Sequence, residues 1–90
     1  MILEFTKNQG GQYETSFVTS DKNVVQLHYE SKTPALVQVK CRVDAEMPWT
    51  IIKSIPSVPS DFIFDVDVPS DLFVLIESSV EVSQAAVTSD

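Results

Sequence analysis

Residues 35–43 alternate between apolar and polar side chains along almost their whole length. A period of two is the repeat of a β-strand, whereas a helix repeats about every 3.6 residues. The segment is therefore expected to be a strand with one buried face and one solvated face. The buried face would hold Ala35, Val37, Val39, Cys41 and Val43, and the solvated face Gln38, Lys40, Arg42 and Asp44.

Similar alternation recurs along the chain, and the breaks between the apolar segments are rich in Gly, Pro, Ser, Asn and Asp, which favour turns. No window of about eleven residues keeps an uninterrupted helical period, so at most one helical turn is expected, near 44–47. We expect 25–29 and 35–43 to pair as an antiparallel hairpin. Strands are expected at 2–6, 13–19, 25–29, 35–43, 49–54, 62–68, 72–77 and 80–84.

This pattern predicts an all-β fold. Thirteen valines, six threonines, five phenylalanines and two tyrosines suit pleated, half-buried strands. Cys41 is the only cysteine, so no disulfide can form within the chain. We expect residues 1–90 to form a single small antiparallel β-sandwich domain, immunoglobulin-like, with seven or eight strands, and a small closed barrel is the alternative.

The charge is distributed unevenly. The net charge is −7; residues 1–53 carry six acidic and all six basic residues, and residues 54–90 carry seven acidic residues and no Lys or Arg. Nucleic acid and an anionic membrane surface are therefore not expected as partners, because both need basic patches. The first residues lack the pattern of a secretory signal peptide and no apolar run is long enough to cross a bilayer, so a soluble protein is expected.

The tetrapeptide Val-Pro-Ser-Asp occurs twice, at 58–61 and 68–71. Pro sets the backbone angle of a tight turn, and Ser and Asp hydrogen-bond nearby backbone N–H groups. The strand expected between the two copies spans roughly 20 Å. Asp61 and Asp71 would thus lie at opposite ends of the domain and could not share a site.

If the second copy closes a hairpin, Val66 faces Val74 and the inner face of the pair is entirely apolar. The outer face would then combine aspartates with Ile63, Phe73 and Leu75, an apolar patch with a polar border that is typical of interfaces. The alternatives are a central strand buried on both sides or a register shifted by one residue.

Four groups in the sequence could take part in chemistry: an aspartate pair, a histidine, a cysteine and a tryptophan. Asp65 and Asp67 would point to the same side of a strand and are therefore candidate Ca²⁺ ligands. Ca²⁺ takes six to eight oxygens, however, which two carboxylates do not supply. The alternative is that both aspartates simply belong to the solvated face of the strand. His28, the only histidine, is expected on the surface without a catalytic partner. Cys41 is expected to be an inert core thiol, and Trp49 a large core residue or, if exposed, a platform for sugars.

The order of Cys41 on one strand and Trp49 at the start of the next resembles the cysteine and tryptophan pattern of the immunoglobulin sandwich. The second cysteine and the tyrosine of the antibody pattern are missing. In size and strand pattern, the whole chain resembles the small, disulfide-free, immunoglobulin-like sandwiches that serve as auxiliary (decoration) capsid proteins of tailed phages.

The resemblance implies a non-enzymatic structural protein located in a virion, or otherwise in the cytoplasm. Its partners would be capsid or other assembly subunits or further copies of itself, bound through sheet edges and the outer apolar patch. A glycan-binding or Ca²⁺-binding sandwich module is the alternative function. No enzyme activity and no cofactor are expected.

Overall fold

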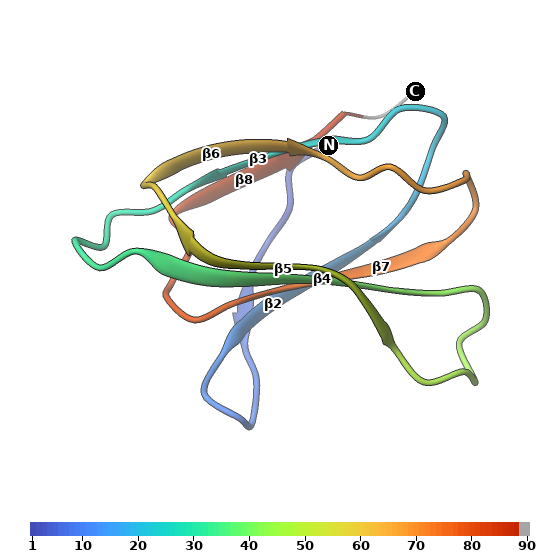
Figure 1. The fold of residues 1–90 in the computed structure, drawn as a ribbon, viewed down its shortest axis with the longest axis horizontal. Helices are drawn as coiled ribbons and strands as arrows, with labels where there is room; N and C mark the ends of the chain where they lie inside the picture. The colour runs from blue at the N-terminus through green and yellow to red at the C-terminus, as the bar shows by residue number, and fades with distance from the viewer. Residues whose placement is uncertain (89–90) are drawn as a thin grey trace.

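The computed structural model describes residues 1–88 and consists of two antiparallel β-sheets packed face to face (Figure 1). The predicted β-sandwich without a disulfide is therefore confirmed. Residues 1–88 contain no helix that could span a membrane. The strands are β1 (Thr6–Lys7), β2 (Tyr13–Val18), β3 (Val24–His28), β4 (Ala35–Arg42), β5 (Thr50–Val58), β6 (Asp61–Asp65), β7 (Phe73–Ser78) and β8 (Gln84–Val87).

The larger sheet has five strands in the order β1-β2-β7-β4-β5, and the smaller has three in the order β6-β3-β8. In Figure 1 the smaller sheet lies above the larger one. Only two pairs of consecutive strands, β1 with β2 and β4 with β5, are hairpin neighbours. Every other connection carries the chain from one sheet to the other.

The two pairings expected around 31–34 and 69–71 are wrong. β3 and β4 lie in different sheets, and so do β6 and β7. In each case the apolar faces of the two strands meet across the core and not side by side in one sheet. Alternation shows which side chains point inward, but it does not distinguish a neighbour in the same sheet from a strand in the facing sheet.

The core lies between the sheets and receives side chains from both. Leu27 and Val25 come from β3, and Val37 and Val39 from β4, and all four are fully buried. The inward orientation expected for the apolar residues of 62–68 and 72–76 is confirmed for Phe64 of β6, for Val66 directly after it, and for Val74 and Ile76 of β7, which are all buried. The Cys41 thiol is buried as well.

The two Val-Pro-Ser-Asp segments lie at different ends of the sandwich. The first joins β5 to β6, and Asp61 is opposite His28 at the end of β3. The second precedes β7 and is tied to Thr19, whose carbonyl accepts the Asp71 N–H at 3.1 Å and whose hydroxyl donates to Pro69 at 2.7 Å. Asp71 has a φ of 66°, which Asp tolerates better than most residues. The expected separation of Asp61 from Asp71 agrees with these positions.

Several strand bounds differ from the expectation. β6 ends at Asp65 and not at 68, and the last strand is Gln84–Val87, so of the strand expected at 80–84 only Gln84 lies in a strand. Residues 1–3 pair with the edge of β8 before the chain crosses to the larger sheet, which splits the strand expected at 2–6. Residues 44–47 form a single turn in which the Met47 N–H donates to the Asp44 carbonyl at 3.1 Å.

The core assignment can be tested by a matched pair of substitutions. Ile76→Ala should lower the free energy of unfolding by about 2–5 kcal/mol, because it leaves a cavity at a fully buried side chain. Ile63→Ala removes the same atoms from a side chain that is 62 % exposed and should cost less than about 1 kcal/mol. Urea unfolding measures both values, and equal losses would contradict the assignment.

Candidate interaction surfaces

The three residues predicted to share an apolar patch lie on two different sheets. Phe73 and Leu75 belong to β7 in the middle of the larger sheet, whereas Ile63 belongs to β6 at an edge of the smaller one. The expected single patch is therefore wrong, because it depended on pairing β6 with β7. Phe73 is 36 % exposed, Leu75 is half-buried and Ile63 is 62 % exposed, so each reaches the outer surface of its own sheet.

Phe73 forms part of an apolar row across the outer face of the larger sheet. It lies opposite Val18 of β2 on one side and opposite Arg42 of β4 on the other. Val18 is 53 % exposed. The next row contains Leu75, Lys40 and Ile51, which are cross-strand partners on β7, β4 and β5. We call Val18, Arg42, Trp49, Ile51, Phe73 and Leu75 the outer patch.

Trp49 belongs to this outer patch and not to the core, which corrects the expectation of a core residue. Its ring is half-buried, and the Arg42 guanidinium lies over it with 4.0 Å between Cζ and the ring centroid. Such cation–π contacts contribute roughly 0.5–1 kcal/mol at exposed sites. Arg42 Nη1 also donates to the Met47 carbonyl at 3.3 Å. One face of the indole is thus occupied by Arg42, which leaves less of the ring free for a sugar.

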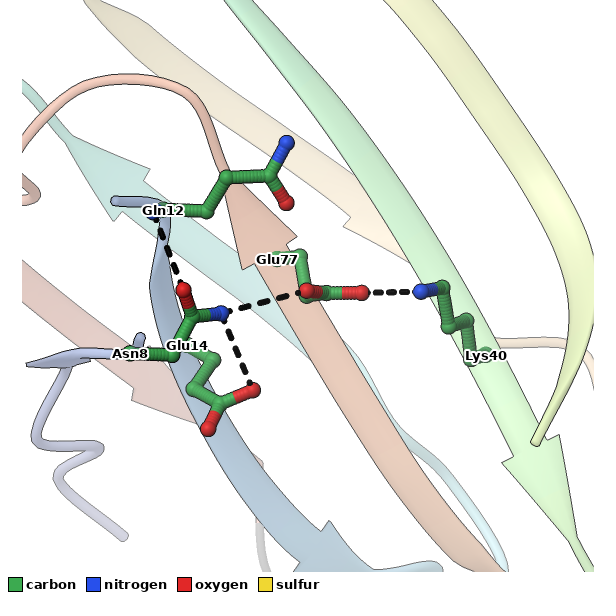
Figure 2. A network of polar contacts seen from close by, with 5 residues as sticks. All are labelled: Asn8, Gln12, Glu14, Lys40 and Glu77. Atoms are coloured by element: carbon green, nitrogen blue, oxygen red, sulfur yellow. Dashed lines mark hydrogen bonds and ion pairs between the residues drawn. The ribbon is translucent and has the colours of Figure 1, made fainter. Parts of the chain in front are cut away.

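A polar network forms one border of the outer patch (Figure 2). Lys40 of β4 makes an ion pair with Glu77 of β7, and their side chains are only 22 % and 11 % exposed. Glu77 lies opposite Glu14 of β2. The Asn8 side-chain amide donates to both carboxylates, at 3.5 Å to Glu14 and 3.4 Å to Glu77, and its oxygen accepts the Gln12 N–H at 3.1 Å.

The network reduces the repulsion between the Glu14 and Glu77 carboxylates. Two like charges directly opposite each other on neighbouring strands are destabilising. The Lys40 ammonium offsets the charge of Glu77, and the shared Asn8 amide offers a donor to Glu14 and to Glu77. The border of the outer patch is therefore held by specific contacts between four elements of the larger sheet, including the turn between β1 and β2.

The His28 side chain pairs with Asp61 on the outer face of the smaller sheet, with 2.6 Å between Nδ1 and Oδ1. The two residues are 33 positions apart, and only the β3–β6 register brings them together. Their side chains are 40 % and 71 % exposed, so the surface position expected for His28 is confirmed. Within residues 1–88, no hydroxyl group hydrogen-bonds to the ring, so the pair lacks a positioned nucleophile.

An open groove of about 690 Å³ lies beside this pair, between the N-terminal segment and β8. Its lining combines Gln26 and His28 of β3 with Ile2, Glu4 and Ala86. No charged cluster converges on it: in the part of the chain that the structure describes, no three His, Cys, Asp or Glu residues are grouped closely enough to hold a metal ion.

The proposed Ca²⁺ ligands are not neighbours on one regular strand. Asp65 is the last residue of β6, and Asp67 lies in the following segment, where the Val68 N–H donates to the Val66 carbonyl at 3.1 Å. Both aspartates are exposed. Two carboxylates alone provide fewer oxygens than the six to eight of a Ca²⁺ site.

Two buried groups have displaced pKa values. Burial raises the pKa of the Tyr29 phenol above its ordinary value of 10.0, and the nearby Ser78 hydroxyl counteracts part of this effect. Burial also raises the pKa of the Cys41 thiol above its ordinary value of 9.0. A raised pKa keeps the thiol protonated, so Cys41 is a core residue and a poor nucleophile.

Comparisons with known proteins found no protein-family model, no curated protein and no solved structure that matches this chain.

The contribution of the Lys40–Glu77 ion pair can be measured by a double-mutant cycle. Lys40→Met keeps the aliphatic stem but leaves the largely buried Glu77 carboxylate without its cation, and should lower the free energy of unfolding by about 1–3 kcal/mol. Adding Glu77→Gln should recover part of the loss, because a neutral amide needs no cation. Urea unfolding of the wild type, of Lys40→Met, of Glu77→Gln and of the double variant completes the cycle, and a coupling energy near zero would show that the pair contributes nothing.

Stability should also fall at alkaline pH. Tyr29 and Cys41 have folded-state pKa values above their unfolded values, so the stability they contribute is present below about pH 9 and is lost as the pH rises through the folded-state values. Tyr29→Phe and Cys41→Ala should each weaken this decline between about pH 8 and about pH 11. Unfolding curves across that range test the effect, and profiles parallel to that of the wild type would refute it.

Proposed function

We propose that this chain is a non-enzymatic interaction protein that binds a neighbouring protein through the outer patch. The single observation that carries the proposal is the position of Phe73. Its ring is exposed between Val18 and the Arg42–Trp49 pair, on a sheet whose inner face already builds the core. Burial against a partner would remove this apolar surface from water.

The composition of the outer patch supports an interface. Aromatic residues and Arg are enriched at the centres of protein–protein interfaces, and a polar rim surrounds them. Phe73, Trp49 and Arg42 are the aromatic and Arg residues of the outer patch. The network around Lys40 and Glu77 forms part of its polar rim. Arg42 also keeps its guanidinium over the Trp49 ring, so the two side chains present one joined surface to a partner.

In its most specific form, the proposal is an auxiliary structural protein of a virion, with capsid or other assembly subunits and further copies of itself as partners. The resemblance in size and strand pattern to phage decoration proteins supports this form. The all-β fold without a disulfide agrees with it. An exposed apolar patch is typical of a protein that functions while it is bound to neighbouring proteins.

The test of the proposed interface is Val18→Lys combined with Phe73→Lys. Both side chains are exposed, so the variant should stay folded, but two positive charges at the centre of the outer patch should abolish binding. Co-sedimentation with the native particle measures binding to the assembly, and sedimentation velocity of the isolated protein measures self-association. Circular dichroism and urea unfolding verify the fold.

Gln26→Lys combined with Gln84→Lys is the matched control. It adds the same two charges to exposed positions on the outer face of the smaller sheet. This control should bind like the wild type. If the folded Val18→Lys/Phe73→Lys variant also binds like the wild type, the outer patch is not the interface.

A further inference from the structure

The outer edge of β6 offers a row of unpaired backbone groups. In an antiparallel ladder, the N–H and C=O of successive residues point alternately to the two neighbours. The Ser60 carbonyl accepts the Tyr29 N–H, and the Val66 N–H donates to the Asn23 carbonyl, both at 2.8 Å, so the even-numbered residues of this segment bond to β3. The backbone groups of Asp61, Ile63 and Asp65 consequently point away from the sheet.

The other sheet edges in residues 1–88 are less suited to accept a strand. β1 has only two residues, and β8 is covered by residues 1–3, whose Leu3 N–H donates to the Ala85 carbonyl at 2.9 Å. β5 is longer, but its register shifts twice against β4 and Pro56 has no N–H. β6 pairs with β3 in unbroken register over its five residues.

The side chains on this edge define the chemistry of a partner. Asp61, Ile63 and Asp65 alternate with the inward residues of β6, so all three lie on the outer face of the smaller sheet. Ile63 is 62 % exposed and has a carboxylate two residues away on either side. Opposite charges on facing residues of paired strands are favourable, as are apolar pairs.

We propose that β6 binds an extended segment of a partner protein as a fourth strand of the smaller sheet. The segment carries an apolar residue opposite Ile63 and Lys or Arg opposite Asp61 and Asp65. Backbone hydrogen bonds to the three outward residues provide the binding energy, and the alternating side chains provide the selectivity. This inference rests on the proposed interaction function and identifies one class of partner, on a surface separate from the outer patch.

A second copy of this chain does not fit this edge. Antiparallel pairing of two β6 strands centred on Ile63 would place Asp61 of each copy opposite Asp65 of the other, and like charges in those positions are destabilising. The net charge of −7 adds a general repulsion between copies. The same aspartates that oppose self-pairing attract a basic strand.

The test uses the ¹⁵N-labelled protein and a capped Lys-Thr-Val-Thr-Lys peptide, followed by amide hydrogen exchange. In the free protein, the amides of Phe62 and Phe64 should be protected by β3, while those of Ile63 and Asp65 exchange rapidly. Saturating peptide should slow exchange at Ile63 and Asp65 by at least about tenfold. A matched Glu-Thr-Val-Thr-Glu peptide should give no protection.

Three variants test the charge pairs and the backbone pairing separately. Asp61→Asn combined with Asp65→Asn should weaken binding about three- to tenfold, because two favourable cross-strand charge pairs are lost. Ile63→Pro removes one outward N–H without removing a bond to β3 and should abolish binding, whereas Ile63→Val should bind like the wild type. Continued protection at Phe62 and Phe64 verifies that each variant is folded.

The inference is overturned if exchange at Ile63 and Asp65 is unchanged at saturation, if the peptide protects another edge, or if the acidic peptide or a scrambled Lys-Lys-Val-Thr-Thr peptide binds equally well. It is also overturned if folded Ile63→Pro binds like the wild type. None of these results bears on the outer patch, because Val18→Lys/Phe73→Lys leaves the β6 edge intact.

Discussion

The burial of one apolar face from each sheet is the constraint on which the rest of this structure depends. Val37 and Val39 of β4 and Ile76 of β7 meet the side chains of β3, including Leu27, in a core to which residues 1–88 contribute no charged side chain. No disulfide reinforces it. Burial stabilises each such side chain by roughly 1.5–3 kcal/mol. With the inner faces committed to the core, the outer faces and the free edges of the sheets are available for binding.

The sequence pattern was sufficient to predict the fold class, most of the inward residues and the position of most turns. Val43 is an exception, because the strand ends at Arg42 and the side chain expected on the buried face is 69 % exposed. It was not sufficient to predict which strands are neighbours. Val66 and Val74 are both buried, as expected, but β6, which Val66 follows, and β7, which contains Val74, lie in different sheets. Facing and neighbouring strands present the same alternation, so the choice between them depends on packing of the whole core. That error grouped Ile63 with Phe73, and the structure separates them.

The specific polar contacts could not be predicted from the sequence either. His28 and Asp61 are 33 residues apart, and Asn8 and Glu77 are 69 apart. Each contact follows from the register between strands that are distant in the chain. No local motif marks either pair, because exposed Asp, Glu and Asn are common on any solvated strand face. The position of Trp49 depended in the same way on where β5 enters the larger sheet.

The outer patch and the β6 edge differ in chemistry and lie on different sheets. The outer patch combines aromatic and aliphatic side chains with Arg42, whereas the β6 edge presents backbone groups between Asp61 and Asp65. Because the core separates the two sheets, occupation of one surface leaves the other accessible. Two independent surfaces allow one small domain to connect two neighbours, and each contact raises the effective concentration for the other. The proposed function in an assembly would use this arrangement, because a protein that connects two neighbours needs a separate surface for each.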